Sequence, residues 1–407
     1  MNRTLPAIPR RALLAGGIGL SLVPRRALAA EPFRIGVLAD MSGPYADIGG
    51  PGSVAGARMA VEDFGGSVLG RPIEVLAADH QNKTDIGVAV AREWLGPRDV
   101  GLILDMGNSA IALALQGLVR DADRVAIPIS AVSSDLTGKA CSANSIQWAQ
   151  DNWSNGVALM RALRKAGKRT FFFVTVDYSF GLSLESDAAA EVRKSGGTVV
   201  GVVRHPLNTT DFSSYLLQAQ ASGAEVVVFA SAGTDTVTAI EQAHEFGLTP
   251  RQVLTAPSFY LATAYAIGLP KAQGLQVMQS WYWDSSDATR AWARRFYARR
   301  QRMPNDVHAA AYSAVGHYLG AVAKVGSNHG REVIAAMRAT PVRDMFTQDG
   351  RIREDNKMVF TRYLMRVKAP EESHGPWDLL ALLGTIPPDQ AFRPLSEGGC
   401  PLVKGAG

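Results

Sequence analysis

Short runs of β-branched and apolar residues alternate with segments of helical period along most of the chain, and this alternation restricts the fold more than any other feature. Val54, Ala57 and Val61, for example, fall on one face of the first expected helix. Strands and helices in alternation form parallel sheets that helices cover on both faces. The expected strands are Phe33–Ala39, Ile73–Ala78, Gly101–Asp105, Val125–Ile129, Thr170–Val176, Thr198–Val203, Glu225–Ala230 and Gln252–Ala256. The expected helices between them are Gly52–Phe64, Asp85–Leu95, Ala110–Asp121, Asn155–Ala166, Leu182–Ser195, Ser213–Ser222 and Thr236–Phe246.

The alternation occurs twice, once before about residue 150 and once after it. A chain of 407 residues is too long for one comfortable core. The repetition therefore predicts an α/β fold with two doubly wound parallel-sheet lobes joined by a multi-strand hinge. We expect residues 31–150 to form the first lobe, with 284–355 returning to it. We expect residues 151–283 to form the second lobe, with 356–407 crossing back as a C-terminal tail. This last third includes expected helices at Ala288–Arg300 and Asp306–Val325 and an expected strand at Met358–Val367.

Residues 1–30 have the features of an export signal peptide. The segment has five arginines and no acid, and its apolar run Ala12–Val23 is too short to span a membrane. Ala27–Ala29 offers small residues for cleavage after Ala29 or Ala30. A buried N-terminal helix would leave the arginine pairs unexplained. Pro9–Leu14 resembles a twin-arginine signal without the usual Ser before the pair and Phe after it, so the Sec and twin-arginine routes both remain open.

The signal segment accounts for the basic character of the chain. Five of the 42 Lys and Arg residues lie in it, so the remainder has as many basic residues as its 37 acidic ones. The charge therefore indicates no nucleic-acid partner, and no other segment is apolar for long enough to insert into a membrane. We expect a periplasmic protein. In that oxidising compartment a disulfide between Cys141 and Cys400 is favoured, with two free thiols as the alternative.

Patterns typical of catalysis are missing from the sequence. The seven histidines form no HExxH motif or Cys/His cluster, and there is no GxSxG or CxxC, so no enzyme, metal or cofactor is predicted. One enzymatic alternative rests on Gly50–Gly56, which opens a helix and is followed by Asp79, as in a dinucleotide fingerprint. Its spacing is poor, because Asp40–Gly49 intervenes after the strand. An exported dinucleotide-dependent oxidoreductase is kept as the alternative.

Several segments together resemble, in order and spacing, the leucine/isoleucine/valine-binding family of type I periplasmic binding proteins, the solute receptors of ABC importers. These segments are Asp40–Gly49, Gly56–Ala60, Pro128–Thr137, Asp177–Gly181, Asp211–Ser213 and Ala224–Val227. The resemblance implies two α/β lobes, a hinge of three strands and a small-molecule ligand enclosed between the lobes. It also implies a membrane permease as partner. A sensory receptor of the same fold is a further alternative.

The resemblance places one wall of the ligand cleft on loops that follow strands of the first lobe. The implied residues are Tyr45, Ile48, Met106, Gly107, Asn108, Ser109, Ser130, Ala131 and Val132. Ligands of parallel sheets bind at the carboxyl ends of the strands, where these loops begin. Because Met106–Ser109 opens a helix, its N–H groups suit a carboxylate. Asn108 and Ser109 are equally suited to capping that helix.

In the second lobe the resemblance places Phe180 over the ligand and Gly233–Asp235 and Ser258–Tyr260 on the opposite wall. Amino-acid binders of the family usually have an acid where this chain has Pro257 and Ser258. Without it a ligand ammonium is poorly compensated, although Asp235 or Asp151 could substitute. We expect a small carboxylate, a branched-chain amino acid-like, keto or aromatic acid, and the missing acid favours a deaminated carboxylate (a keto, hydroxy or aromatic acid) over a standard α-amino acid. The expected contacts from the second lobe and the crossings are Asp151, Trp153, Phe180, Asp235, Ser258, Phe259, Tyr282 and Trp283. Hinge packing is the alternative role for the aromatic residues near the crossings.

Overall fold

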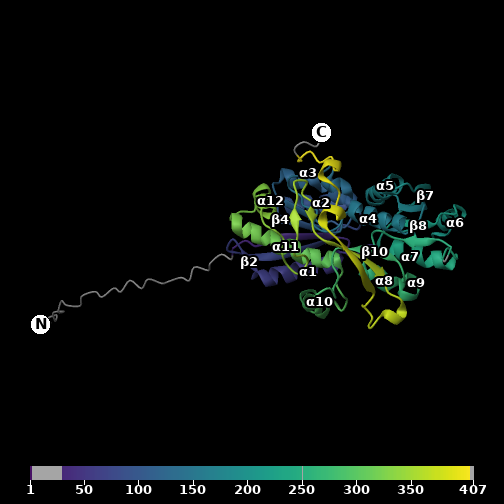
Figure 1. Cartoon of the computed structure of the whole chain (residues 1–407). Coiled ribbons are helices and arrows are strands. Elements are labelled where there is room, and N and C mark those ends of the chain that lie inside the picture. The colour runs from purple at the N-terminus through teal and green to yellow at the C-terminus, as the bar shows by residue number, and fades with distance from the viewer. Residues whose placement is uncertain (2–29, 250, 404–407) are drawn as a thin grey trace.

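The computed structural model describes residue 1, residues 30–249 and residues 251–403. The expected signal peptide therefore lies outside the described residues, except for Met1 and Ala30. Two lobes stand side by side, and a pair of long strands runs between them (Figure 1).

The first lobe is built on a five-stranded sheet of order β2-β3-β1-β4-β5, parallel except for the short β2. Leu38, Ile103 and Ala126 belong to a buried cluster with residues of α2 and α3, whereas Val37 and Leu104 belong to a cluster with residues of α1 and α11. Alternate residues of each strand thus face different helices, as burial on both faces requires. The strands are β1 (Phe33–Ala39), β2 (Ser67–Val68), β3 (Arg71–Asp79), β4 (Val100–Asp105) and β5 (Val125–Pro128). The helices are α1 (Gly50–Phe64), α2 (Thr84–Leu95), α3 (Ser109–Asp121), α10 (Asp287–Arg300), α11 (Asp306–Val325) and α12 (Gly330–Arg338).

The second lobe is built on a four-stranded parallel sheet of order β7-β6-β8-β9. In its central strand, Phe171 and Phe173 share a buried cluster with residues of α4 and α5, and Phe172 and Val174 share another with residues of α6 and α7. The strands are β6 (Thr170–Val176), β7 (Thr198–His205), β8 (Val226–Ala230) and β9 (Val253–Thr255). The helices are α4 (Asn152–Lys165), α5 (Ser179–Lys194), α6 (Ser213–Ala221), α7 (Gly233–Glu245), α8 (Leu261–Ile267) and α9 (Leu269–Ala272).

Three chain segments run close together between the lobes. Met358 N–H donates to the Gln147 carbonyl at 3.1 Å, and Ser280 Oγ donates to Gln150 Oε1 at 2.8 Å. Two of the segments adjoin an antiparallel sheet of order β10-β13-β14, and the segment with Gln147 and Gln150 leads into α4. The remaining elements are β10 (Gln276–Gln279), β11 (Arg351–Ile352), β12 (Met358–Val359), β13 (Arg362–Val367), β14 (Leu380–Ile386) and α13 (Pro388–Ala391).

The hinge contains a fully buried cation, Arg362. Its guanidinium donates to Ser154 Oγ at 2.7 Å and Asn155 Oδ1 at 2.8 Å. Burial lowers its pKa to about 10, because the charged form loses hydration. The charge of nearby Asp306 opposes that shift. These hydrogen bonds tie the start of α4 to β13 and fix the hinge geometry.

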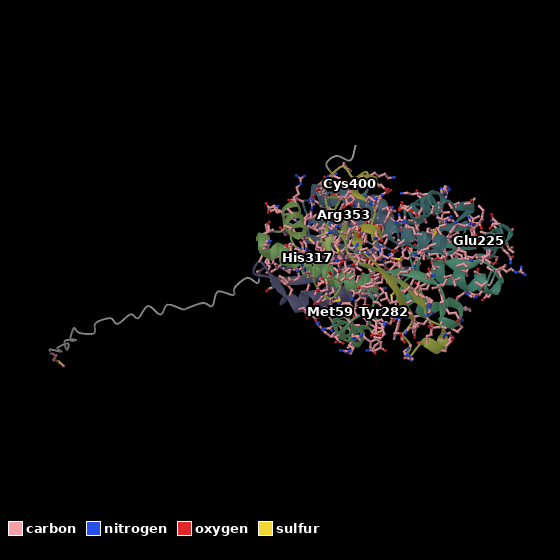
Figure 2. The ribbon with its side chains drawn as sticks, in the orientation of Figure 1. Met59, Glu225, Tyr282, His317, Arg353 and Cys400 are labelled. Atoms are coloured by element: carbon pink, nitrogen blue, oxygen red, sulfur yellow. A yellow bond between two sulfur atoms is a disulfide. The ribbon has the colours of Figure 1, made fainter. Side chains whose placement is uncertain are left out.

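The C-terminal tail is fastened to the first lobe by a disulfide between Cys141 and Cys400, whose Cα atoms lie 5.6 Å apart across 259 residues of sequence. Figure 2 marks Cys400 at the top of the molecule, above Arg353. Arg353 donates to the tail carbonyl of Arg393 at 2.7 Å. Within the described residues, no helix is long and apolar enough to cross a membrane.

The last third differs from the expectation in several elements: β10, β11, β14 and α13 were not expected, one expected strand is divided, and one helix was missed. The expected strand Met358–Val367 is divided into β12 and β13, because Thr361 between them donates its N–H and hydroxyl to the Asp349 carboxylate instead of to a neighbouring strand. Helix α12 was not expected, although Val333, Ile334 and Met337 form its buried face. Its length of nine residues equals that of the expected helix α6, so its apolar face was an available signal.

Candidate functional site

The carboxyl ends of the parallel strands of both lobes face one another, and a narrow cleft lies between them. The loops after β1, β4 and β5 form its wall in the first lobe, and those after β6, β8 and β9 form the opposite wall. The lining residues are Tyr45, Ile48, Gly107, Ser109, Ser130, Val132, Tyr178, Phe180, Ala232 and Tyr260. The cavity left between them is about 20 Å³, little more than one water molecule occupies. The lobes are therefore in a closed arrangement.

Direct contacts across the cleft hold the lobes together. Tyr178 Oη donates to Tyr45 Oη at 2.9 Å, and Thr234 N–H donates to the Pro44 carbonyl at 3.2 Å. Gly233 at the start of α7 has φ +62°, and a Cβ there would lie 2.1 Å from the Pro44 oxygen. Only a glycine allows the two backbones this approach.

The start of α3 reaches the cleft from the first lobe. Gly107 and Ser109 line the cavity, whereas Asn108 is the N-cap: its Oδ1 accepts from Ala110 N–H at 2.9 Å. Its amide donates to Asn82 Oδ1 at 3.4 Å. An N-terminus of a 13-residue helix presents N–H groups and the positive end of the helix dipole toward the cleft.

A buried carboxylate, Asp105, lies directly behind this wall. It is the last residue of β4, and its Oδ1 accepts the hydroxyl of Ser130, which lines the cavity. Its Oδ2 has no hydrogen-bond partner among the described residues. Burial raises the pKa of Asp105 to about 6. Sequence reasoning missed this residue, although a lone acid at the end of the apolar run Val100–Asp105 was a usable signal.

A second buried carboxylate, Asp235, lies behind the wall of the second lobe. Its Oδ2 accepts from Asn208 N–H at 3.2 Å and lies 3.9 Å from His205 Nδ1. Burial raises the pKa of Asp235 to about 7 and lowers that of His205. Burial raises the pKa values of Tyr45 and Tyr178, and the negative charge of Asp235 adds to both shifts.

We expect Asp235→Asn to gain stability over the wild type as the pH rises. The folded wild type keeps the Asp235 proton up to about pH 7, whereas the unfolded chain releases it near about pH 4. The wild type therefore loses stability across this window, and asparagine has no proton to lose. Urea unfolding at about pH 4.5 and about pH 8 measures the difference in free energy of unfolding. A difference that does not change with pH would contradict the expectation.

Seven of the expected contacts line the cavity, namely Tyr45, Ile48, Gly107, Ser109, Ser130, Val132 and Phe180, and so does Tyr260 of the expected wall segment Ser258–Tyr260. Met106, Asn108, Ala131, Asp151, Trp153, Asp235, Ser258, Phe259, Tyr282 and Trp283 are not among its lining residues. Two lining residues, Tyr178 and Ala232, were not expected. Tyr178 lies in the same Asp177–Gly181 motif that pointed to Phe180, and its position directly after β6 was the available signal.

The residues of the crossings have contacts of their own. Asp151 caps α4 through Ser154 N–H at 2.7 Å and lies 3.7 Å from Lys357 Nζ. Trp283 lies in a groove between α10 and the loop that joins β13 to β14, where its Nε1–H donates to the Trp377 carbonyl at 3.0 Å. Helix α10 packs on α1 of the first lobe, and the strand ends beside this loop belong to the core of the second lobe.

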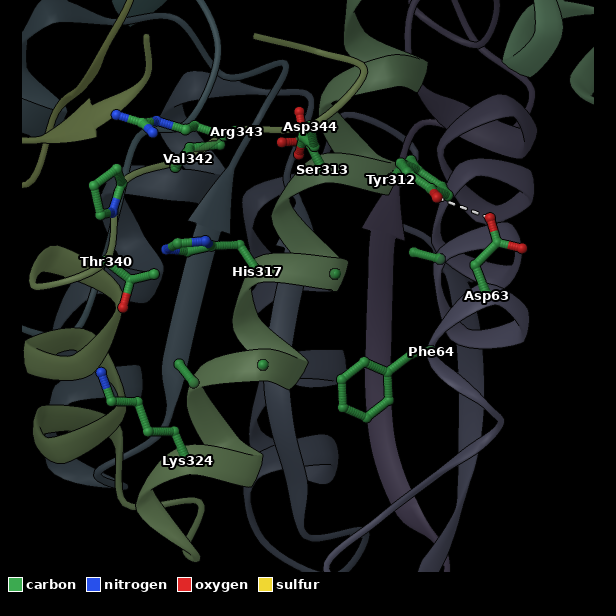
Figure 3. A pocket seen from close by; sticks show the side chains of 15 residues that line it. Asp63, Phe64, Tyr312, Ser313, His317, Lys324, Thr340, Val342, Arg343 and Asp344 are labelled. Atoms are coloured by element: carbon green, nitrogen blue, oxygen red, sulfur yellow. Dashed lines mark hydrogen bonds between the residues drawn. The ribbon is translucent and has the colours of Figure 1, made fainter. Parts of the chain in front are cut away.

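A groove of about 490 Å³ on the first lobe lies away from the strand ends. Figure 3 shows it between α1, α11 and the segment after α12. Tyr312 Oη donates there to Asp63 at 2.8 Å, and His317 Nε2 lies 3.0 Å from the Met337 carbonyl. None of the expected site residues lines this groove, and no group of acids, His or Cys in the described ranges has the arrangement of a metal site.

The glycines of the dinucleotide-like motif contact protein. A Cβ at Gly52 would lie 2.1 Å from His308 Nε2, and one at Gly56 would lie 2.5 Å from the His308 carbonyl oxygen. Both glycines thus allow α1 to pack closely against α11. Their role in helix packing leaves the motif no surface for a pyrophosphate.

A sequence model of a family described as periplasmic binding proteins matches residues 32–374. The chain is 27% identical over 280 residues to the Leu/Ile/Val-binding protein homolog 7 of Brucella suis biovar 1, which covers 66% of this chain and 67% of that protein. A periplasmic binding protein from Burkholderia mallei is 43% identical, with a TM-score of 0.90, and covers 92% of this chain and all of its own.

A branched chain amino acid ABC transporter periplasmic ligand-binding protein from Burkholderia xenovorans is 38% identical, with a TM-score of 0.81. It covers 91% of this chain and 99% of its own. Sequence, fold and the position of the cleft thus agree. The chain belongs to the periplasmic binding protein family, the extracytoplasmic solute receptors of ABC importers.

Proposed function

We propose that this protein captures a small carboxylate in the cleft between its lobes and delivers it to the membrane permease of an ABC importer. The observation that carries the proposal is the start of α3, where Gly107 and Ser109 line the cavity. Helix N-termini bind anions because their N–H groups are free of intrahelical partners and the helix dipole favours negative charge.

The rest of the cleft suits an apolar side chain. Ile48, Val132 and Phe180 line it, and the rings of Tyr178 and Tyr260 contribute further apolar surface. The chemistry of this lining suits an aliphatic or aromatic acid, which the cleft admits when the lobes stand farther apart than in the described arrangement. The Burkholderia xenovorans protein named for branched-chain amino acids supports the aliphatic side of this range.

Hinge closure is the mechanism we infer. The Tyr178–Tyr45 and Thr234–Pro44 hydrogen bonds join opposite lobes, so they form only when the lobes meet. A ligand on the wall of the first lobe would be covered by the second lobe and lose contact with water. The closed form then presents one surface across both lobes to the permease.

Thermal unfolding of the exported chain with aliphatic and aromatic acids tests the ligand class. Each acid is paired with its neutral amide. A ligand that binds only the folded state raises the unfolding temperature by mass action. Acids that stabilise the protein beside inactive amides would support the proposal. Equal effects of acid and amide, or none from any acid, would reject it.

We expect Tyr178→Phe to weaken binding of a stabilising acid about fivefold, since one buried hydrogen bond contributes about 1 kcal/mol. The variant removes the hydroxyl that joins Tyr178 to Tyr45 and leaves the ring in place. Tyr312→Phe is the matched control, because its hydroxyl bonds to Asp63 far from the cleft. Calorimetric titration of both variants provides the measurement, and equal affinities would contradict the expected role.

A further inference from the structure

We propose that Asp105 is a positioning residue that turns Ser130 into a hydrogen-bond acceptor toward the ligand, so that the cleft selects an acid with a hydrogen-bond donor beside its carboxylate. This inference rests on the proposed function and specifies its ligand class. The favoured ligands are 2-amino and 2-hydroxy acids, and the disfavoured ones are 2-oxo acids.

The direction of the Asp105–Ser130 hydrogen bond follows from the chemistry of its partners. An ionised carboxylate has no proton, so the hydroxyl of Ser130 must donate to Asp105 Oδ1. That donation uses the only proton of the hydroxyl. No other described residue donates to Ser130 Oγ, and Ser130 is one of the residues that line the cavity. Its lone pairs are therefore available to a donor group on the ligand.

The surrounding backbone fixes the carboxylate in this position. Asp105 and Met106 both have left-handed φ, +82° and +53°, which residues with side chains rarely adopt. A Cβ at Gly49 would lie 2.5 Å from Asp105 Oδ2, so this glycine leaves room for the carboxylate. Asp105 itself is fully buried. A buried acid held by a strained turn and a glycine is a built feature of the cleft wall.

The two polar features of this wall are close together. A Cβ at Gly107, which precedes α3, would lie 3.2 Å from Ser130 Oγ. A ligand carboxylate at the start of α3 thus brings its neighbouring carbon to Ser130. An amino or hydroxyl group on that carbon can donate to Ser130 Oγ. A keto oxygen has no proton to donate, so its lone pairs would face those of Ser130 Oγ and the two oxygens would repel each other. An ammonium gains further from the negative charge of Asp105, which supplies the acid that the loop after β9 lacks.

Calorimetric titration with two matched series tests the inference. The probes are valine, 2-hydroxyisovalerate and 2-oxoisovalerate, and phenylalanine, 3-phenyllactate and phenylpyruvate. In each series that binds, we expect the wild type to bind the hydroxy acid about tenfold more tightly than the oxo acid. This factor corresponds to one hydrogen bond gained by the hydroxy acid and the desolvation of Ser130 left uncompensated by the oxo acid. Comparison of the amino acid with the hydroxy acid of the same series separates the effect of the ammonium charge on affinity from the effect of hydrogen-bond donation.

Asp105→Asn should reduce or reverse the preference, because the asparagine can present its NH2 group to Ser130 as well as its oxygen, so the hydroxyl proton is no longer held away from the ligand. Ser130→Ala should bring the hydroxy-to-oxo ratio near one, and it keeps the test valid if Asp105→Asn does not fold. Asp187→Asn is the matched control. Asp187 accepts the hydroxyl of Ser134 at 2.5 Å but does not line the cavity, so the ratio should remain that of the wild type.

The outcomes separate this inference from the proposed function. Binding of either series with an oxo preference in the wild type, or with an unchanged ratio in Asp105→Asn and Ser130→Ala, would overturn the role of Asp105 and leave carboxylate binding intact. Failure of all six acids to bind would overturn the proposed ligand class and this inference with it.

Discussion

Replacing Gly233 with alanine is expected to weaken binding of a stabilising acid about 100-fold, equivalent to about 2.7 kcal/mol. The added Cβ would lie 2.1 Å from the Pro44 carbonyl oxygen, which belongs to the opposite lobe. The lobes cannot approach as described here, so the binding-competent closed form loses population and the apparent affinity falls in proportion. Titration calorimetry measures the affinity, and small-angle X-ray scattering measures whether the protein still contracts on ligand addition.

Gly223→Ala is the matched control for this prediction. Gly223 has φ +63°, almost the value at Gly233, but no atom lies within 4 Å of its added Cβ. Both variants therefore bear a similar cost of about 1 kcal/mol for a side chain in the left-handed region. Only Gly233→Ala adds a clash between lobes. Equal affinities of the two variants would show that closure does not depend on the approach of Gly233 to Pro44.

Removing the Cys141–Cys400 disulfide is expected to lower the free energy of unfolding by roughly 5 kcal/mol. The bridge closes a segment of 259 residues, and cross-links over long segments restrict the unfolded chain most. The tail would also lose its attachment to the first lobe. Urea unfolding of the double variant Cys141→Ser/Cys400→Ser, compared with the oxidised wild type, measures the loss.

Reduced wild-type protein provides the control for the disulfide. It should unfold at the same urea concentration as the double variant, because both lack the cross-link and differ only in two side-chain atoms. If oxidised and reduced wild type unfold together, the cross-link does not contribute to stability and the expectation is wrong.

The period of the apolar residues predicted most of the two sheets. Strands Phe33–Ala39 and Thr170–Val176 occur with the expected bounds, because burial on both faces leaves a continuous apolar run that polar turns interrupt at each end. The break at Thr361 could not be predicted in the same way. It depends on the distant Asp349 carboxylate, and local periodicity carries no information on such a partner.

The position of the cleft was also predictable, since loops after parallel strands meet at one edge. Side-chain direction was not. Tyr178 and Phe180 are two residues apart in one motif, and both line the cavity. The hydrogen bond between Tyr178 and Tyr45 could not be predicted from the motif, because it depends on how the two lobes meet. Asp105 was missed for a different reason: its burial behind Ser130 depends on the distant Gly49, which leaves room for the carboxylate.

The placement of Trp283 between α10 and the loop after β13 has a practical consequence. An indole whose emission depends on its surroundings lies where the two lobes adjoin, with its Nε1–H bonded to the Trp377 carbonyl. We expect rotation of the lobes to change the polarity and packing around this ring. Trp283, one of seven tryptophans, is then an intrinsic fluorescent reporter of hinge motion, and a stopped-flow signal on ligand addition that Trp283→Phe abolishes would test this.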